Sequence, residues 1–495
     1  MQKRLFIFLF YLLLPFINGV EKNLVFINFV PLHGYLKGDK IMHGHTDNYT
    51  FLTQGPIHRV ILTMAVPTII SMLVTGLYNI ADTFFVGKID TQATAAVGVS
   101  FSMMFFVQAM GFFFGHGSGN YISRELGAKR HDNAIKMAST GFFSSFFFGI
   151  VILVLGEIFL TPLSLMLGST PTILPYTESY MRLILLGAPF LTSSLTLNNQ
   201  MRLQGNANFA MYGIVTGAIL NVALDPLLIF TCGMGVSGAA LATVIGQFVS
   251  FVILFFMTRR GENIAIHFRH FSPSWAAYKE IFYGGSPSLM RQGLACIATM
   301  SLNLAAGVYG DSAIAAMSIV GRIAMLSFAA VIGLGQGFQP VCGFCYGAGL
   351  YTRLKKAYNF TVALGTSFLI LLAIGCWIVS DSLIGVFRDD PKVIEIGVVA
   401  LRWQLCTFPL NAFILASNMM AQTCRKPLRA NVLAAARQGL FFIPLIFILP
   451  AHLGLLGVEM CQAVSDVFSF ILSVPIVVYT FKEFNKEAVV RRVAE

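Results

Sequence analysis

Charged residues are scarce in this sequence. Only 11% of its 495 residues are Asp, Glu, Lys or Arg, whereas about a quarter of the residues of a soluble domain are charged. Hydrophobic residues make up 56% of the chain, and the mean hydropathy is +0.75. This composition excludes a soluble globular protein and predicts an all-α polytopic membrane protein.

The sequence also lacks the common motifs of catalysis and nucleotide binding. It contains no GxxxxGK(S/T), GxSxG or HExxH motif and no Gly-rich Rossmann turn. Its eight cysteines are scattered through apolar segments. The one CxxC, formed by Cys342 and Cys345, has no second pair or nearby His and is a weak signal for metal or redox chemistry. We therefore expect no enzyme, no catalytic residues and no cofactor.

Acidic residues are fewer than basic ones, 22 against 33, and the net charge is +11. A basic protein can bind nucleic acid, but here the basic residues lie in short connections between apolar runs, where they indicate topology. They occur in every second connection and in the C-terminal tail, at Arg124, Lys129, Arg130, Arg202, Arg259, Arg260, Arg269, Arg353, Lys355, Lys356, Arg425, Lys426, Arg429, Lys482, Lys486, Arg491 and Arg492. We therefore expect no nucleic-acid partner and place both termini in the cytoplasm.

Twelve apolar runs follow residue 56, each long enough to cross a bilayer, which takes about 20 residues. They cover residues 57–86, 93–118, 133–160, 176–200, 209–231, 237–258, 281–305, 313–338, 354–378, 392–418, 430–450 and 456–481. We divide the chain into an N-terminal extension (1–55), an N-lobe (56–260), a cytoplasmic linker (261–280), a C-lobe (281–482) and a cytoplasmic tail (483–495).

The first 20 residues are typical of a signal peptide, with Lys3 and Arg4 before an apolar run. A cleaved signal would place residues 43–55 outside the cell. The alternation of basic connections requires the opposite, because the first strong span must enter the membrane from the inside. We therefore expect translation to start near Met42.

The two halves of the chain are copies of each other. A shift of 220 residues, without a gap, aligns Pro67 with Pro287, Gly87 with Gly307, Gly115 with Gly335, Gly117 with Gly337, Gly127 with Gly347, Lys136 with Lys356, Pro171 with Pro391 and Pro189 with Pro409. Because six spans is an even number, the copies share their orientation in the membrane. We predict two pseudo-symmetric six-helix lobes that enclose a cavity and rock to open it alternately.

Two aspartates interrupt apolar runs of the first copy. Asp82 follows Asn79 by three residues in the first run, and Asp225 follows Asn221 by four in the fifth, so each acid shares a helical face with an amide. Both acids lie near the outer ends of their runs, at similar depth. We interpret the four residues as a cation-coupling set for Na⁺ or H⁺, with Asp82, Asn221 and Asp225 as the ligands of Na⁺. The alternative is a hydrogen-bonded cluster that only locks the lobe.

The second copy differs at the corresponding positions. It has Leu302 where the first copy has Asp82, and residues 443–445 are apolar where the first copy has Asp225. Its buried charges are of both signs, and internal ion pairs are their expected role. They are Arg291, Arg322, Arg402, Arg437, Glu395, Glu459 and Asp466. We therefore expect the coupling cation to bind in the N-lobe.

Four segments resemble the multidrug and toxic compound extrusion (MATE) family, and its bacterial multidrug branch most closely. They are GPIHRVILTMAVPTIISMLVTGLYNIADTFFVG, GFFFGHGSGNYISRELGAKR, ILNVALDPLLIF and GFQPVCGFCYGAG. The resemblance covers roughly residues 55–482. It implies a V-shaped bundle of two six-helix lobes that exports organic cations or amphipathic drugs in exchange for Na⁺ or H⁺. It matches Asp82 to the family's first-helix acid, and Asn221 and Asp225 to its fifth-helix pair.

The resemblance does not extend to every acid of the family. Some branches also carry acids in the seventh and tenth helices, where this chain has Arg291 and Arg402. A flippase for a lipid-linked glycan or another amphiphile on a related fold is the alternative function, and the N-lobe acids count against it. We expect a multi-pass monomer in a bacterial inner membrane that contacts lipid and small-molecule substrates.

Overall fold

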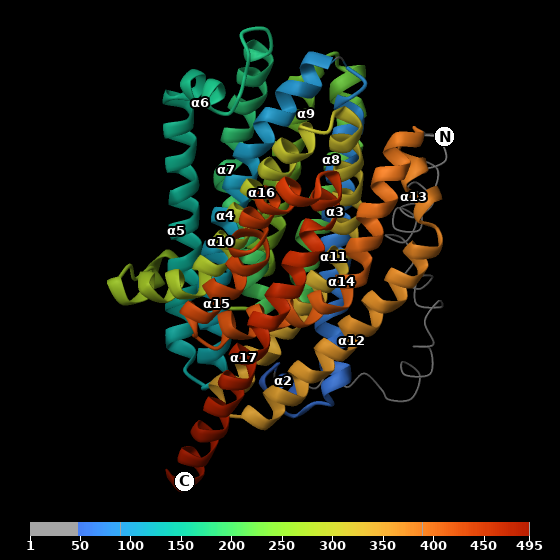
Figure 1. The fold of residues 1–495 in the computed structure, drawn as a ribbon. Helices are drawn as coiled ribbons and strands as arrows, with labels where there is room; N and C mark the ends of the chain where they lie inside the picture. Colours follow the sequence, from blue (N-terminus) through green and yellow to red (C-terminus); the bar gives the residue numbers. More distant parts are fainter. Residues whose placement is uncertain (1–47, 90, 389, 495) are drawn as a thin grey trace, which may run out of the picture.

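The computed structural model describes residues 48–89, 91–388 and 390–494, and this part of the chain is helical, without strands (Figure 1). The expected start at Met42 lies outside the described residues. The N-lobe contains α2 (Asn48–Gln54), α3 (Ile57–Val86), α4 (Thr91–Gly127), α5 (His131–Ile158), α6 (Leu160–Met166), α7 (Leu174–Leu203), α8 (Ala207–Pro226), the π-helical turn η2 (Leu227–Thr231) and α9 (Gly235–Met257).

The C-lobe repeats this order after a connection that contains the short 3₁₀ helix η3 (Phe268–His270). It contains α10 (Trp275–Gly307), α11 (Asp311–Gly347), α12 (Tyr351–Ile378), α13 (Ser380–Phe387), α14 (Pro391–Thr423), α15 (Pro427–Ala435), the π-helical turn η4 (Ala436–Leu440), α16 (Phe442–Leu453) and α17 (Leu455–Ala494). The helix α17 continues through most of the segment assigned to the tail.

Eleven helices of the described residues are long and apolar enough to cross a membrane. The other long helix, α10, has 33 residues and contains Lys279, Glu280 and Arg291, which make it more polar. It packs against α4 and α11 and occupies the position of the seventh predicted span. The predicted all-α polytopic architecture is confirmed.

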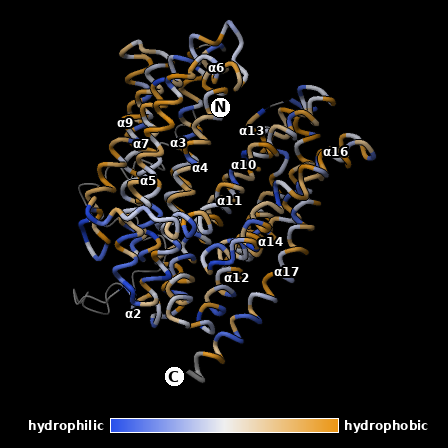
Figure 2. The backbone as a smooth tube through the Cα atoms, turned by 90° about the vertical axis from the view of Figure 1, so that its left-hand side faces the viewer, coloured by the Kyte–Doolittle hydropathy of each residue, from blue (hydrophilic) through white to orange (hydrophobic). Residues whose placement is uncertain are grey.

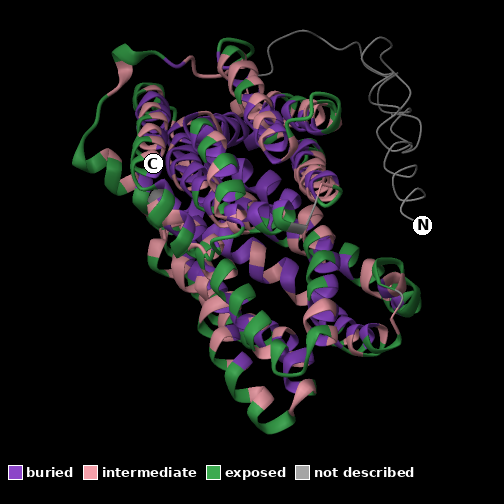
Figure 3. Ribbon diagram, turned by 90° about the horizontal axis from the view of Figure 1, so that it is seen from above, coloured by how far each residue is buried: buried purple, intermediate pink, exposed green. Residues whose placement is uncertain are grey.

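The two lobes meet at one end and diverge toward the other. Figure 2 shows them converging near α2 and the C-terminal end of α17, which we call the narrow end, and separating toward α6 and α13. The contacts between the lobes are made chiefly by α3 with α11 and by α4 with α10 and α11. Buried residues gather where helices face each other, and exposed residues lie on the outer faces (Figure 3).

The helices α4 and α11 extend beyond their predicted ends at residues 118 and 338, to Gly127 and Gly347. The extensions are rich in polar residues, which sequence reasoning assigned to connections. The assignment of Arg124 to a connection is wrong, because this residue lies in the last turn of α4 and is buried. Its Nη1 donates to the Thr423 carbonyl in the C-lobe at 2.9 Å, and its Nη2 lies 2.9 Å from Glu280 Oε2.

The assignment of Arg202 to a connection is also wrong. Arg202 lies in the last turn of α7 and is only 1% exposed. Its guanidinium donates to the Gln336 carbonyl and, at 3.1 Å, to Gln339 Oε1, both on α11. Because α7 belongs to the N-lobe and α11 to the C-lobe, this arginine joins the lobes near the narrow end.

Gly127 and Gly347, which occupy equivalent positions in the two copies, permit a close approach of the lobes. A Cβ atom on Gly127 would overlap the Phe344 carbonyl, and one on Gly347 would overlap the Arg124 carbonyl. Residues 124 and 344 are themselves equivalent under the repeat. The contact between α4 and α11 is therefore pseudo-symmetric and depends on small residues.

A second pair of equivalent contacts lies inside the lobes. Asn198 Nδ2 donates to the Ala210 carbonyl at 2.8 Å in the N-lobe, and Asn418 Nδ2 donates to the Ala430 carbonyl at 2.7 Å in the C-lobe. The same shift that aligns the sequences aligns both partners of this bond. The repeat is thus present in side-chain contacts as well as in helix order.

Gly347→Ala is expected to keep the narrow end apart, because the new methyl group would overlap backbone that cannot rotate away. The thiol of Cys424, now buried beside this contact, should then react with maleimide, as site-resolved mass spectrometry would show. Gly375→Ala is the matched control, since nothing lies within 4 Å of its Cβ position. A protected Cys424 in the Gly347 variant would contradict this account of the contact.

Candidate functional site

The helices α3 and α8 pack against each other and carry the two N-lobe acids. Asp82 lies near the end of α3 and is 3% exposed. Asp225 lies at the end of α8, just before Pro226, and is fully buried. Proline cannot donate a backbone hydrogen bond, and here the α-helix gives way to the π-helical turn η2. Both carboxyl groups therefore lie inside the lobe, toward its wide end.

The two carboxyl groups lie on packed helices without a compensating base. Ala81, next to Asp82, and Val222, next to Asn221, pack against the same hydrophobic cluster. Among the described residues, neither acid forms an ion pair, and no donor contacts Asp82 Oδ1 or either oxygen of Asp225. Burying a carboxylate in this way is costly unless a partner neutralises it. The arrangement therefore favours a bound cation or proton.

Asn221 adds a neutral oxygen to this pair. It lies one turn before Asp225 on α8 and is 2% exposed. Its Nδ2 donates to Thr243 Oγ1 on α9 at 3.1 Å, and Thr243 in turn donates to the Ala239 carbonyl. The nitrogen side of the amide is held in this way, and Oδ1 has no donor among the described residues. Thr243 was not identified from the sequence.

Asn79 has a different environment from Asn221. Its side chain is half-buried, and its Nδ2 donates to the Thr75 carbonyl of the same helix at 2.9 Å. This bond holds the amide along α3, one turn from Asp82. Of the four residues predicted to couple cations, Asp82, Asn221 and Asp225 are the three that are fully buried.

Tyr180 on α7 belongs to the same cluster and was missed by sequence reasoning. It is 0% exposed, and its hydroxyl has no hydrogen-bond partner among the described residues. It packs in one hydrophobic cluster with Ala81 and Val222, which lie next to Asp82 and Asn221 in the chain. A single tyrosine in an apolar run is ordinarily a core residue, so the sequence carried no signal for this role.

The cluster contains only oxygen as a potential ligand. Two carboxylates, an amide oxygen and a phenol suit a hard monovalent cation or a proton. Among the described residues, no group of three or more His, Cys, Asp and Glu side chains is arranged to hold a metal ion, as a divalent transition-metal site would need. The surroundings are apolar, because Ala81 and Val222 pack with Tyr180 in one hydrophobic cluster.

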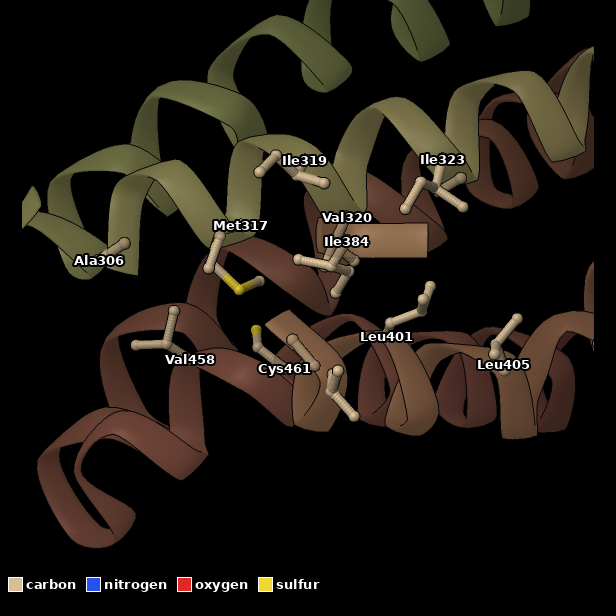
Figure 4. Close-up of a cluster of buried hydrophobic side chains, with 14 of the residues drawn as sticks. Ala306, Met317, Ile319, Val320, Ile323, Ile384, Leu401, Leu405, Val458 and Cys461 are labelled. Atoms are coloured by element: carbon tan, nitrogen blue, oxygen red, sulfur yellow. The ribbon is translucent and has the colours of Figure 1, made fainter. Parts of the chain in front are cut away.

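The corresponding region of the C-lobe is hydrophobic. Leu302 and Leu445, the counterparts of Asp82 and Asp225, both pack against one cluster of buried apolar residues. Figure 4 shows this cluster, in which Met317 and Val320 face residues of α14 and α17. The two leucines thus occupy in the C-lobe the places that the acids occupy in the N-lobe, without a polar group to bind an ion.

One buried acid of the C-lobe, Asp466 on α17, is fully hydrogen-bonded. Its Oδ1 accepts from Arg437 Nε and from Gln462 Nε2, each at 2.8 Å. Its Oδ2 accepts from Asn411 Nδ2 at 2.8 Å and from Thr407 Oγ1 at 3.3 Å. This carboxylate has four donors, whereas Asp225 has none among the described residues. The contrast assigns Asp466 a structural role.

The other predicted C-lobe ion pairs do not form inside the lobe. Arg402 lies 3.2 Å from Asp381, and both side chains are exposed. Arg322 is exposed and forms no ion pair among the described residues. Glu459 is buried near the like-charged Glu395. Among the described residues, the expectation of internal ion pairs is therefore right only for Arg437 with Asp466.

Each of the two lobes matches the same protein family model. The MatE family model matches residues 67–227 and 287–448, once in each lobe. The multidrug export protein MepA of Staphylococcus haemolyticus (strain JCSC1435) is 27% identical over 412 residues, which cover 82% of this chain and 90% of that protein. MepA of Staphylococcus aureus (strain N315) is 26% identical over the same length.

Solved structures show the same arrangement. A crystal structure of MATE in complex with MaL6 has a TM-score of 0.84 and 25% sequence identity, and the similarity covers 89% of this chain and 100% of that one. A multidrug resistance MATE family transporter in the outward-facing conformation also has a TM-score of 0.84, with 25% identity over 89% of this chain and 99% of its own. Since the two matches of the family model together span more than half of the sequence, the chain belongs to the MatE family, multidrug and toxic compound extrusion.

Proposed function

We propose that this protein is a secondary active antiporter that exports organic cations or amphipathic drugs in exchange for Na⁺ or H⁺. The observation that carries the proposal is the pair Asp82 and Asp225, buried together without a base and with oxygens that lack donors. A carboxylate placed in the membrane interior is a functional site by default. The relatives named as multidrug export proteins match along most of this chain.

The proposed coupling follows from charge repulsion. Two carboxylates in low dielectric repel each other, so the pair favours one bound proton even without a second cation. A Na⁺ ion or a second proton offsets the remaining repulsion. If the two conformations of the lobes differ in their affinity for the cation, a substrate that favours one conformation changes the affinity for the cation. By linkage, the bound cation changes the affinity for the substrate by the same factor.

We place the narrow end in the cytoplasm of a bacterial cell, in the plasma membrane, with both termini on that side and one chain as the functional unit. The basic connections lie at this end. One example is Arg353, whose guanidinium donates to the carbonyls of Leu52 and Gly55 beside α2. The positive-inside rule assigns such connections to the cytoplasm. The lobes, closed there and apart at the other end, then form an outward-facing state.

The flippase alternative predicts no dependence on a cation. Uptake of a fluorescent drug into everted membrane vesicles, driven separately by a pH gradient and by a Na⁺ gradient, distinguishes the two functions. We expect one of the gradients to drive uptake. Accumulation that neither gradient changes would contradict the antiporter.

Asn221→Ala is expected to weaken coupling without abolishing it, because it removes one neutral ligand and leaves both carboxylates. The concentration of the driving cation that gives half-maximal transport should rise a few-fold to about tenfold, as loss of one hydrogen-bonding group predicts. Asn79→Ala is the comparison, and it should change this concentration less, since its amide is bonded within α3. Equal effects of the two substitutions would contradict the assignment of Asn221.

A further inference from the structure

A cavity of about 100 Å³ lies inside the C-lobe, among α10, α11, α14, α15 and η4. Its polar lining consists of Arg291, Asn411, Asn418, Arg437 and Gln438. None of the lining residues is acidic. The rest of the wall is apolar and is formed by residues such as Phe328, Ile332, Leu415 and Leu433. The cavity therefore joins positive charge to a hydrophobic surface.

Arg291 brings an uncompensated charge to this cavity. It lies in the middle of α10, and its Nη1 donates to Asn418 Oδ1 at 3.0 Å. This is its only hydrogen bond to a described residue, and no described acid forms an ion pair with it. A neutral amide orients the guanidinium but leaves its charge in place. Arginines inside membrane proteins are rare and mark substrate or ion pathways, where an anion can pair with them.

Arg437 contributes a second guanidinium to the cavity, and two contacts hold its side chain in place. Its Nε is bonded to Asp466, and Phe328 stacks against it with the guanidinium carbon 4.6 Å from the ring centroid. Both Nη atoms have no acceptor among the described residues. The Asp466 oxygens already have four donors, so this acid is not available to Arg291. The side chain of Arg437 is 23% exposed, so this residue is not sealed inside the lobe.

The fifth helices of the two lobes carry different charges. In each lobe, the fifth helix contains a π-helical turn, η2 after Asp225 and η4 around Arg437. Such turns redirect side chains and occur frequently at functional sites. The two turns are not equivalent, because the shift of 220 residues pairs Arg437 with Gly217, eight residues before Asp225. The fifth helix of the N-lobe thus carries an acid and that of the C-lobe an arginine, at different positions.

We propose that the cavity between Arg291 and Arg437 is the site that binds the carboxylate of a transported zwitterionic amphiphile. Arginine binds carboxylates through paired N–H groups, and the apolar wall receives the carbon atoms next to the carboxylate. A drug-sized ligand fills about 300 Å³ or more, so only the anionic end fits into 100 Å³. This inference rests on the transport function proposed above.

The test uses two dyes that differ in one charge, rhodamine B and its methyl ester, and measures their binding to the purified protein by fluorescence anisotropy. Arg291→Gln is expected to weaken binding of rhodamine B roughly tenfold to a hundredfold, the loss of a charged hydrogen bond, and to change binding of the ester less than about twofold. Arg291→Lys, which keeps the charge, should retain part of the affinity. Arg322→Gln, an exposed arginine of the same lobe, is the matched control and should change neither.

Three results would overturn the proposal. The first is equal affinity of the wild type for both dyes. The second is an equal loss of affinity for both dyes in Arg291→Gln. The third is displacement of rhodamine B by phosphatidylglycerol but not by octanoate. The last would assign the cavity to a lipid head group. Because binding in detergent needs no ion gradient, a failure of ion-driven transport with the carboxylate preference intact would refute the antiporter and leave this site standing.

Discussion

Asp82→Asn and Asp225→Asn are each expected to abolish ion-driven efflux while leaving the protein folded in the membrane. Asparagine keeps the size of the side chain and its hydrogen-bonding capacity but cannot bind a proton or offer a charge to Na⁺. Neither acid has an ion-pair partner to lose among the described residues, so the substitution removes repulsion and should not reduce stability. Drug uptake by everted vesicles should fall to the rate of vesicles without the protein.

The control for these variants is Glu178→Gln, an acid of the same lobe that lies on α7 and bonds to the Thr161 hydroxyl at the surface. This variant should transport at the wild-type rate. Gel filtration of each purified variant would establish that the protein is folded. If both Asp variants transport normally under either gradient, the carboxylates are structural and the proposed coupling is wrong.

Asp466→Asn is expected to have the opposite profile, with a large loss of stability and little change in ion dependence. The substitution leaves Arg437 without its counter-ion and disturbs a carboxylate that accepts four hydrogen bonds. Removing one partner of a buried ion pair costs about 3–5 kcal/mol. The midpoint of thermal unfolding of the purified protein should fall accordingly, while the surviving protein keeps the cation dependence of the wild type.

A double variant, Asp466→Asn with Arg437→Gln, tests the cause of this loss. It replaces the ion pair by two neutral amides, so part of the lost stability should return if the unpaired guanidinium is responsible. An unfolding midpoint of Asp466→Asn equal to that of the wild type would show that the network is not needed for stability.

Much of the fold could be predicted because membrane helices must satisfy their own backbone and therefore appear as long apolar runs. The predicted first run and α3 both cover residues 57–86. The ends of α4 and α11 could not be placed in the same way. Their last turns carry polar residues buried between the lobes, and a pattern read along one chain does not show that a partner helix covers them.

Arg202 illustrates the same limit. Near the end of an apolar run, an arginine usually indicates a cytoplasmic connection, but here it is buried because α11 supplies acceptors from a segment more than a hundred residues away. Short helices such as α6 and α13 were missed because seven or eight residues do not establish a period.

The charged residues of the candidate site could be recognised in the sequence, but its neutral residues could not. Acids in apolar runs are rare enough to be informative, and both Asp82 and Asp225 lie in the cluster. Tyr180 and Thr243 were not found, because a tyrosine or threonine in an apolar helix has many ordinary places in a core. The basic cavity was also beyond prediction. The sequence does not show that Arg437 pairs with Asp466, or that no described acid pairs with Arg291.

The central claim is that Asp82 and Asp225 hold a cation that substrate binding displaces. The most direct measurement adds a transported drug to purified protein and records release of the cation, with a pH indicator in weak buffer for H⁺ and with radioactive ²²Na⁺ for sodium. We predict release of one of the two cations from the wild type and from Glu178→Gln, and none from Asp82→Asn or Asp225→Asn. Drug binding without release of either cation, or equal release from the Asp variants, would contradict the account.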